Sequence, residues 1–188
     1  MRYRREPRWN EGRSFFKNSA PKKVQDWLTD RGSLTQRLIC ACNKKNQGNF
    51  RVVVLKQAWQ KPQASEAKLL GMKQNELGFI RQVHLYCGNI PWVYAKTVIP
   101  RSTLHGELQK LTKLGTQPLG EILFANKHIL RGAIQIAEIT HKRALFDVAT
   151  EKSLNKDNSI WGRRSVFSIA EKPLLVSEIF LSDLVANL

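Results

Sequence analysis

This sequence of 188 residues has few cysteines, few acidic residues and no long apolar stretch. Its three cysteines are an odd number, which argues against a disulfide framework and favours a reducing compartment. No apolar stretch approaches the roughly 20 residues of a transmembrane helix, and the N-terminus lacks the apolar region of a signal peptide. We therefore expect a cytoplasmic protein without a transmembrane segment, folded as one domain that needs no disulfides.

The spacing of the cysteines gives little reason to expect a metal site. Cys40 and Cys42 form a C-x-C pair, but no second pair of ligands accompanies them. We interpret both as small, buried hydrophobic residues. The sequence also shows no internal repeat and no low-complexity segment.

Acidic residues are scarce enough to raise the question of nucleic acid binding. The chain has 31 lysines and arginines against 15 acidic residues, a net charge of +16. Much of the excess falls in residues 1–23, where eight basic residues accompany Glu6 and Glu11. No recognition motif surrounds the aromatic residues of this segment. We expect residues 1–23 to form a flexible basic tail, residues 24–188 to form the folded domain, and no nucleic acid to bind.

Hydrophobic periodicity and turn residues predict short helices between β-hairpins. Ser33 and Gln36 have the spacing of a capping box, so we expect a helix to start at Leu34 and to leave its amide N–H unpaired. The segment 56–75 is predicted to be a surface excursion, and 140–159 has no readable pattern. The other predicted helices cover 22–30, 102–114 and a turn from 118, and the predicted strands cover 50–55, 79–87, 92–99, 132–139, 163–169 and 174–181. This order indicates an α+β fold on an antiparallel sheet flanked by short helices.

Three charged residues break the alternation of polar and apolar side chains in the predicted strands. Alternate side chains share one face of a strand, so Arg81 and Glu178 each lie among apolar residues, and Arg163 shares a face with Phe167. Buried charges are costly unless they are paired, so each needs a partner or a ligand. Two interpretations stay open: an internal salt bridge of Glu178 with Arg81 or Arg163, and a closed polar pocket for a small anion.

Two leucines at predicted helix starts fit such a pocket. Free backbone N–H groups at a helix N-terminus bind carboxylates, and Leu34 and Leu119 occupy this position. Taken alone, both positions fit ordinary core leucines better.

Seven short motifs, taken in order and spacing, resemble the chorismate lyase family. The match runs from about Trp27 to Leu181, and its most specific part is WGRRS at 161–165 followed by PLLVSE at 173–178. The other motifs are SLTQR at 33–37, IR at 80–81, PWV at 91–93, TVIPRSTL at 97–104, and LG at 114–115 with PLG at 118–120. Two features depart from the family pattern, a longer basic tail and an apparent insertion within 139–160.

The resemblance implies a single α+β domain with an antiparallel sheet and a ligand enclosed under helical flaps. It implies a lyase that eliminates pyruvate from chorismate and leaves 4-hydroxybenzoate, the first committed step of ubiquinone biosynthesis in a Gram-negative bacterium. It also implies an enzyme without a metal or a cofactor. We expect the protein to be a monomer whose partners are this substrate and this product.

The ligand-binding positions of the family fall on Leu34 and Leu119, through their main chains, and on Arg81 and Glu178. We assign Arg81 and the two amides to the ring carboxylate, and Glu178 to the C4 hydroxyl group as acceptor or base. Arg163 is assigned to the enolpyruvyl carboxylate. The expected catalytic residues are therefore Glu178 and Arg81.

A competing hypothesis comes from another functional class. Effector-binding domains of some bacterial transcription regulators share this fold and sense a small molecule without catalysis. Such regulators carry a helix-turn-helix domain upstream, and the segment before the first motif is too short for one.

Overall fold

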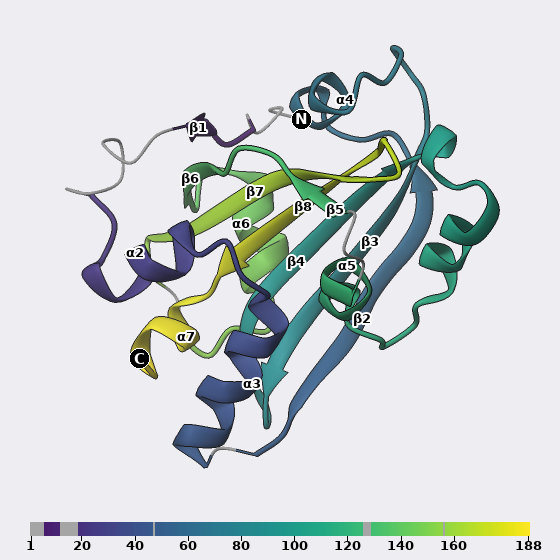
Figure 1. Cartoon of the computed structure of the whole chain (residues 1–188). Helices are drawn as coiled ribbons and strands as arrows, with labels where there is room; N and C mark the ends of the chain where they lie inside the picture. The colour runs from purple at the N-terminus through teal and green to yellow at the C-terminus, as the bar shows by residue number, and fades with distance from the viewer. Residues whose placement is uncertain (1–5, 12–18, 47, 126–128, 156) are drawn as a thin grey trace.

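A computed structural model describes residues 6–11, 19–46, 48–125, 129–155 and 157–188. Its centre is one antiparallel sheet with the strand order β1-β6-β7-β8-β4-β3-β2, and β5 pairs with β7 (Figure 1). The strands are β1 (Asn10–Glu11), β2 (Phe50–Gln60), β3 (Gly78–Cys87), β4 (Ile90–Pro100), β5 (Ile129–Arg131), β6 (Gln135–Thr140), β7 (Ser159–Ile169) and β8 (Lys172–Phe180). The helices are α2 (Lys22–Thr29), α3 (Leu34–Lys45), α4 (Ala64–Leu69), α5 (Leu119–Ala125), α6 (Ala144–Thr150) and α7 (Ser182–Ala186), with 3-10 helices η1 (Arg101–Thr103) and η2 (Gly106–Lys113). The predicted α+β fold with an antiparallel sheet is confirmed.

Helices cover both faces of the sheet (Figure 1). On one face, α2, α3 and α7 share a core with β3, β4 and β8, in which the rings of Trp27 and Phe180 meet edge to face. Leu123 of α5 packs on the same face against Val176 of β8. The opposite face lies under α6, where Phe146 belongs to a separate cluster. The helices of the first face therefore enclose the side of the sheet that carries the predicted charges.

Three segments differ from the sequence-based prediction. β2 continues to Gln60 and α4 follows it, where a surface excursion was predicted, because pairing with β3 resumes after a register shift between Val54 and Lys56. The helix predicted over 102–114 is two 3-10 helices, and Gly106 starts the second with a φ of 55°. The unreadable segment 140–159, where we expected an insertion, contains α6.

Part of the predicted N-terminal tail belongs to the sheet. β1 pairs with the edge strand β6, with Asn10 opposite Ile136. The Glu6 carboxylate accepts hydrogen bonds from the amides of Ala64 (2.9 Å) and Ser65 (3.3 Å), in the first turn of α4. Residues 6–11 are thus attached to the domain, which the basic composition of the segment did not reveal. Residues 1–5 and 12–18 lie outside the described part of the chain.

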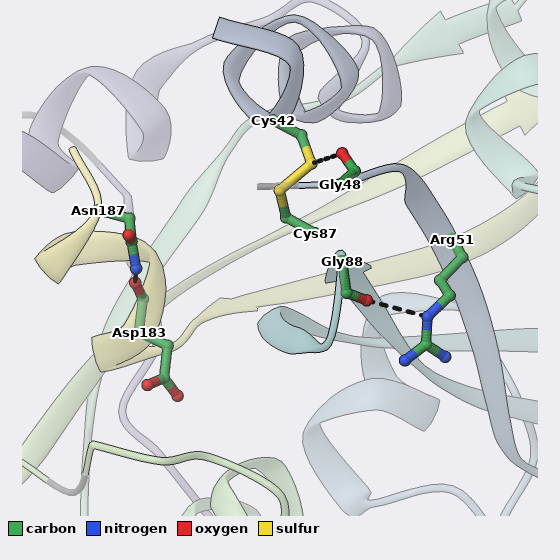
Figure 2. The surroundings of a disulfide bond; sticks show 7 residues. All are labelled: Cys42, Gly48, Arg51, Cys87, Gly88, Asp183 and Asn187. Carbon is green, nitrogen blue, oxygen red and sulfur yellow. Dashed lines mark hydrogen bonds between the residues drawn. A yellow bond between two sulfur atoms is a disulfide. The ribbon is translucent and has the colours of Figure 1, made fainter. Parts of the chain in front are cut away.

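A disulfide joins Cys42 of α3 to Cys87, the last residue of β3 (Figure 2). Their Cα atoms are 5.6 Å apart, a usual distance for a disulfide. This pair contradicts the prediction of cysteines without disulfides, and Cys40, predicted to be buried, is exposed and free. The prediction was wrong because α3 folds back over the sheet and brings together two cysteines 45 positions apart. Neither the odd number of cysteines nor their spacing in the sequence shows which of them meet in the folded chain.

His84 gives the fold a dependence on pH. It is buried on β3 under α6, where Nε2 bonds to the Ala149 carbonyl (2.9 Å) and Nδ1 has no partner among the described residues. Burial lowers the pKa of His84 because it disfavours the charged ring. As the pH falls, His84 therefore binds a proton near pH 6.5 in the unfolded chain, but only at a lower pH in the native state. We expect the free energy of unfolding to fall by up to about 1.4 kcal/mol per pH unit as the pH drops below about 6.5.

Urea denaturation at several pH values between about 7.5 and about 5.5 measures this contribution. His84→Gln keeps a donor for the Ala149 carbonyl and should flatten the pH dependence. His141→Gln removes an exposed histidine and should leave the dependence as in the wild type. The same slope in His84→Gln and wild type would disprove the assignment.

Candidate active site

A pocket lies between the sheet and the first turns of α3 and α5. Its wall is mostly apolar, and four side chains with polar groups line it: Thr35, Arg81, Thr97 and Glu178. The two charged residues come from β3 and β8, which are separated in the sheet only by β4. An enclosed apolar wall with a few convergent polar groups is typical of a small-molecule site.

Arg81 combines burial with an unused hydrogen-bond donor. The residue is 4% exposed, and its Nη2 donates to the carbonyls of Gly115 (2.9 Å) and Gln117 (3.0 Å), in the loop before α5. Its Nε is buried without a partner among the described residues. Burial lowers the pKa of Arg81 because the cation is partly desolvated, yet an arginine stays protonated in proteins. Arg81 therefore fixes the loop before α5 and keeps a charged donor for a ligand.

Glu178 lines the same pocket and is held by Arg163. The two residues face each other across β7 and β8, and Nε of Arg163 lies 2.5 Å from Oε2 of Glu178. Nη1 of Arg163 donates to the carbonyls of Trp27 (2.7 Å) and Asp30 (2.5 Å), at the end of α2. The internal salt bridge left open by the sequence is therefore the one between Arg163 and Glu178. Arg81 takes no part in it and belongs to the pocket.

The structure brings four of the five predicted site residues to one pocket. Leu34, Arg81, Leu119 and Glu178 line it, whereas Arg163 does not. Leu34 starts α3 after the Ser33 N-cap, whose Oγ accepts from the amide of Gln36, as the capping-box pattern predicted. Leu119 starts α5. Both leucines thus place first-turn amides at the pocket, the position in which a helix start binds an anion.

Gly120 allows the two helix starts to meet. A Cβ atom at this position would lie 2.6 Å from Oγ1 of Thr35 and 3.6 Å from Oγ of Ser33. Any larger residue would therefore push the first turn of α5 away from the first turn of α3. The sequence marked this glycine only as part of the PLG motif.

Sequence reasoning missed two polar residues of the pocket. Thr35 and Thr97 are 5% and 4% exposed and line the wall from α3 and β4. Threonine is common in strands and at helix starts, so neither position broke a pattern. One signal was available: Thr97 pairs with Arg81 across β3 and β4, in a hairpin that the sequence predicted.

Within the described residues, no group of three or more His, Cys, Asp and Glu side chains is placed to hold a metal ion. No helix in the same part of the chain is long and apolar enough to cross a membrane.

The fold matches solved structures of another functional class. The C-terminal domain of the histidine utilization repressor from Pseudomonas syringae aligns with a TM-score of 0.53 and 11% identity, over 71% of this chain and 92% of that one. An identity this low shows a shared fold alone. This similarity therefore supports the competing effector-binding hypothesis only at the level of the fold. It gives no support from the residues of the site.

Sequence comparisons reach closer relatives. A family model described as chorismate lyase matches residues 9–187. A probable chorismate pyruvate-lyase of Thiobacillus denitrificans is 35% identical over 165 residues, which are 88% of this chain and 86% of that protein. A probable chorismate pyruvate-lyase of Methylococcus capsulatus is 38% identical over 160 residues, which are 84% and 94% of the two chains. Because the model and both relatives cover most of the chain, this protein belongs to the chorismate lyase family.

Proposed function

We propose that this protein is a chorismate lyase that eliminates pyruvate from chorismate and leaves 4-hydroxybenzoate, the first committed step of ubiquinone biosynthesis. One observation carries the proposal. In a member of this family, one pocket combines a buried arginine that keeps an unused donor with a carboxylate held by a second arginine. The names of the two relatives support the same substrate.

The chemistry asks for positioning more than for reactive groups. Chorismate has a ring carboxylate, an enolpyruvyl ether at C3 and a hydroxyl group at C4. The reaction breaks the bond between C3 and the ether oxygen and removes the hydrogen from C4, so that the ring becomes aromatic. The enolpyruvyl group takes a proton on its methylene carbon and leaves as pyruvate. Aromatisation supplies the driving force, so the protein has mainly to orient the substrate and stabilise developing charge.

Each pocket residue has a role in this proposal. Arg81 and the amides of Leu34 and Leu119 bind the ring carboxylate with charge-assisted hydrogen bonds. Glu178 accepts the hydrogen bond of the C4 hydroxyl group. Arg163, which the sequence assigned to the enolpyruvyl carboxylate, is instead a positioning residue, because it donates to Glu178 and to two carbonyls.

Glu178→Gln tests whether this carboxylate orients the substrate or removes the C4 hydrogen. Glutamine keeps the shape and one acceptor, so loss of an orienting charge should slow the single-turnover rate about tenfold, or about 1.4 kcal/mol. Loss of a base would slow it about 100-fold or more. We expect the smaller effect, because a carboxylate already bonded to an arginine is a poor base. If Glu178 only orients the substrate, the C4 hydrogen passes directly to the methylene carbon of the enolpyruvyl group. With chorismate deuterated at C4, we therefore expect the label in the methyl group of pyruvate.

Two further observations complete this experiment. Glu121→Gln removes an exposed carboxylate from α5, close to the pocket in sequence, and should leave the rate unchanged. The reaction must be quenched, and the mass of the pyruvate measured, before the methyl protons of pyruvate exchange with water. A loss of about 100-fold together with unlabelled pyruvate would establish Glu178 as the base and overturn the orienting role.

A direct assay separates the proposed enzyme from a ligand sensor. Purified protein incubated with chorismate should release 4-hydroxybenzoate and pyruvate in equal amounts. Absorbance measures 4-hydroxybenzoate, and a separate analysis measures pyruvate. Binding of chorismate without its consumption would support the effector-binding hypothesis instead.

We further propose that the protein acts in the cytoplasm, as a monomer and without a cofactor. The disulfide between Cys42 and Cys87 bears against a reducing compartment, since structural disulfides are rare in the cytosol. Thiol alkylation in intact cells, followed by mass spectrometry, would show whether this pair is oxidised where the protein works.

A further inference from the structure

Arg131 is a third arginine on the side of the sheet that carries the pocket. It ends β5 and pairs with Phe167 of β7, which lines the pocket. Its guanidinium carbon lies 5.2 Å from the centre of the Phe167 ring, and its Nε donates to Oγ of Ser165 (3.2 Å). Ser165 and Phe167 share a face of β7 with Arg163, because alternate residues of a strand point the same way. The Arg131 side chain therefore lies against Phe167, a residue of the pocket wall, although Arg131 itself does not line the pocket.

This cation has no anionic partner in the described part of the protein. Its Nη1 donates to the main-chain carbonyl of Asp30 (3.3 Å), but the Asp30 carboxylate pairs with Arg37 (2.9 Å). No carboxylate of a described residue lies within 4.0 Å of the Arg131 guanidinium. Burial and the charge of Arg163 lower the pKa of Arg131 to about 10, so the side chain is still charged at neutral pH. Arg131 is half-buried, so an anionic ligand would offset part of the desolvation cost of its charge.

Chorismate carries two carboxylates, and Arg81 accounts for one of them. Arg163 already uses three of its five N–H groups on Glu178 and two carbonyls, and its charge is paired with that of Glu178. We propose that Arg131 binds the enolpyruvyl carboxylate of chorismate, an assignment that rests on the proposed lyase function. The enolpyruvyl ether at C3 neighbours the hydroxyl group at C4, so its carboxylate belongs near Glu178. Arg131 meets this condition, because it donates to Ser165, which lies two residues along β7 from Arg163, the residue paired with Glu178.

Substrate and product differ by the group that Arg131 binds, which makes the test specific. Arg131→Gln is expected to raise the chorismate concentration that half-saturates the single-turnover rate about 100-fold. The dissociation constant of 4-hydroxybenzoate should stay within about threefold of wild type, because the product has lost the second carboxylate. Equal weakening of both ligands, or no change in either, would overturn the assignment.

Two variants keep the result interpretable. Arg131→Lys keeps the charge without the fork and should show a smaller loss for chorismate alone. If thermal unfolding shows that Arg131→Gln does not fold, the lysine variant decides by the same comparison. Arg37→Gln removes another arginine bonded to Asp30 and should change the binding of neither chorismate nor 4-hydroxybenzoate. Wild-type protein that releases no 4-hydroxybenzoate would overturn the lyase function, whereas a normal wild type with parallel losses in Arg131→Gln overturns only this assignment.

Discussion

Arg81→Ala is expected to weaken binding of 4-hydroxybenzoate by about 2–5 kcal/mol, which is about 30-fold to several thousand-fold in the dissociation constant. The substitution leaves the ligand carboxylate in an apolar pocket without its cation. It also releases the carbonyls of Gly115 and Gln117, so the loop before α5 loses two hydrogen bonds. Turnover of chorismate should fall at least as far, because the same contact orients the substrate. Isothermal titration with 4-hydroxybenzoate measures the first effect, and single-turnover kinetics the second.

Arg51→Ala is the matched control for this result. Arg51 is an exposed arginine of the neighbouring strand β2, bonded to the Gly88 carbonyl and stacked on Tyr86. Its removal takes the same charge from the chain and should leave product binding unchanged. Arg81→Lys, which keeps the charge, should fall between the wild type and Arg81→Ala. Wild-type affinity in a folded Arg81→Ala protein would exclude Arg81 from the binding site.

Cys42→Ser is expected to lower the free energy of unfolding by about 4 kcal/mol under non-reducing conditions. The disulfide closes a loop across 45 positions, which restricts the unfolded chain and so favours the folded state. Urea denaturation with and without a thiol reductant measures the change. Reductant should bring the wild type close to Cys42→Ser and should have little effect on the variant.

Cys40→Ser provides the control, because Cys40 lies on the same helix with an exposed, free thiol. It should match the wild type with and without reductant. If the wild type and Cys42→Ser unfold at the same urea concentration without reductant, the disulfide does not stabilise this fold. Turnover measured on the same samples would show whether α3, which carries Leu34 to the pocket, needs the link to β3.

The charged residues of the site could be predicted from the sequence because they break a pattern. Arg81 and Glu178 stand among apolar residues at a spacing of two, and that period shows which face of a strand a residue occupies. The pattern does not show which charges meet. Both arginines were open as partners of Glu178, and the register of β7 against β8 selects Arg163. That register follows from a two-residue turn, in which Ala170 and Glu171 have φ of 46° and 63°.

The sequence by itself determined the fold class, the helix start at Leu34 and four residues of the pocket, since all of these depend on local periodicity and motifs. Tertiary structure alone decided the disulfide of Cys42 and Cys87, the position of Arg131 beside the pocket, and the attachment of residues 6–11 to the sheet. Each of these is a contact between segments far apart in the chain. Such contacts are set by strand register and by how helices lie on the sheet, and no local pattern records either.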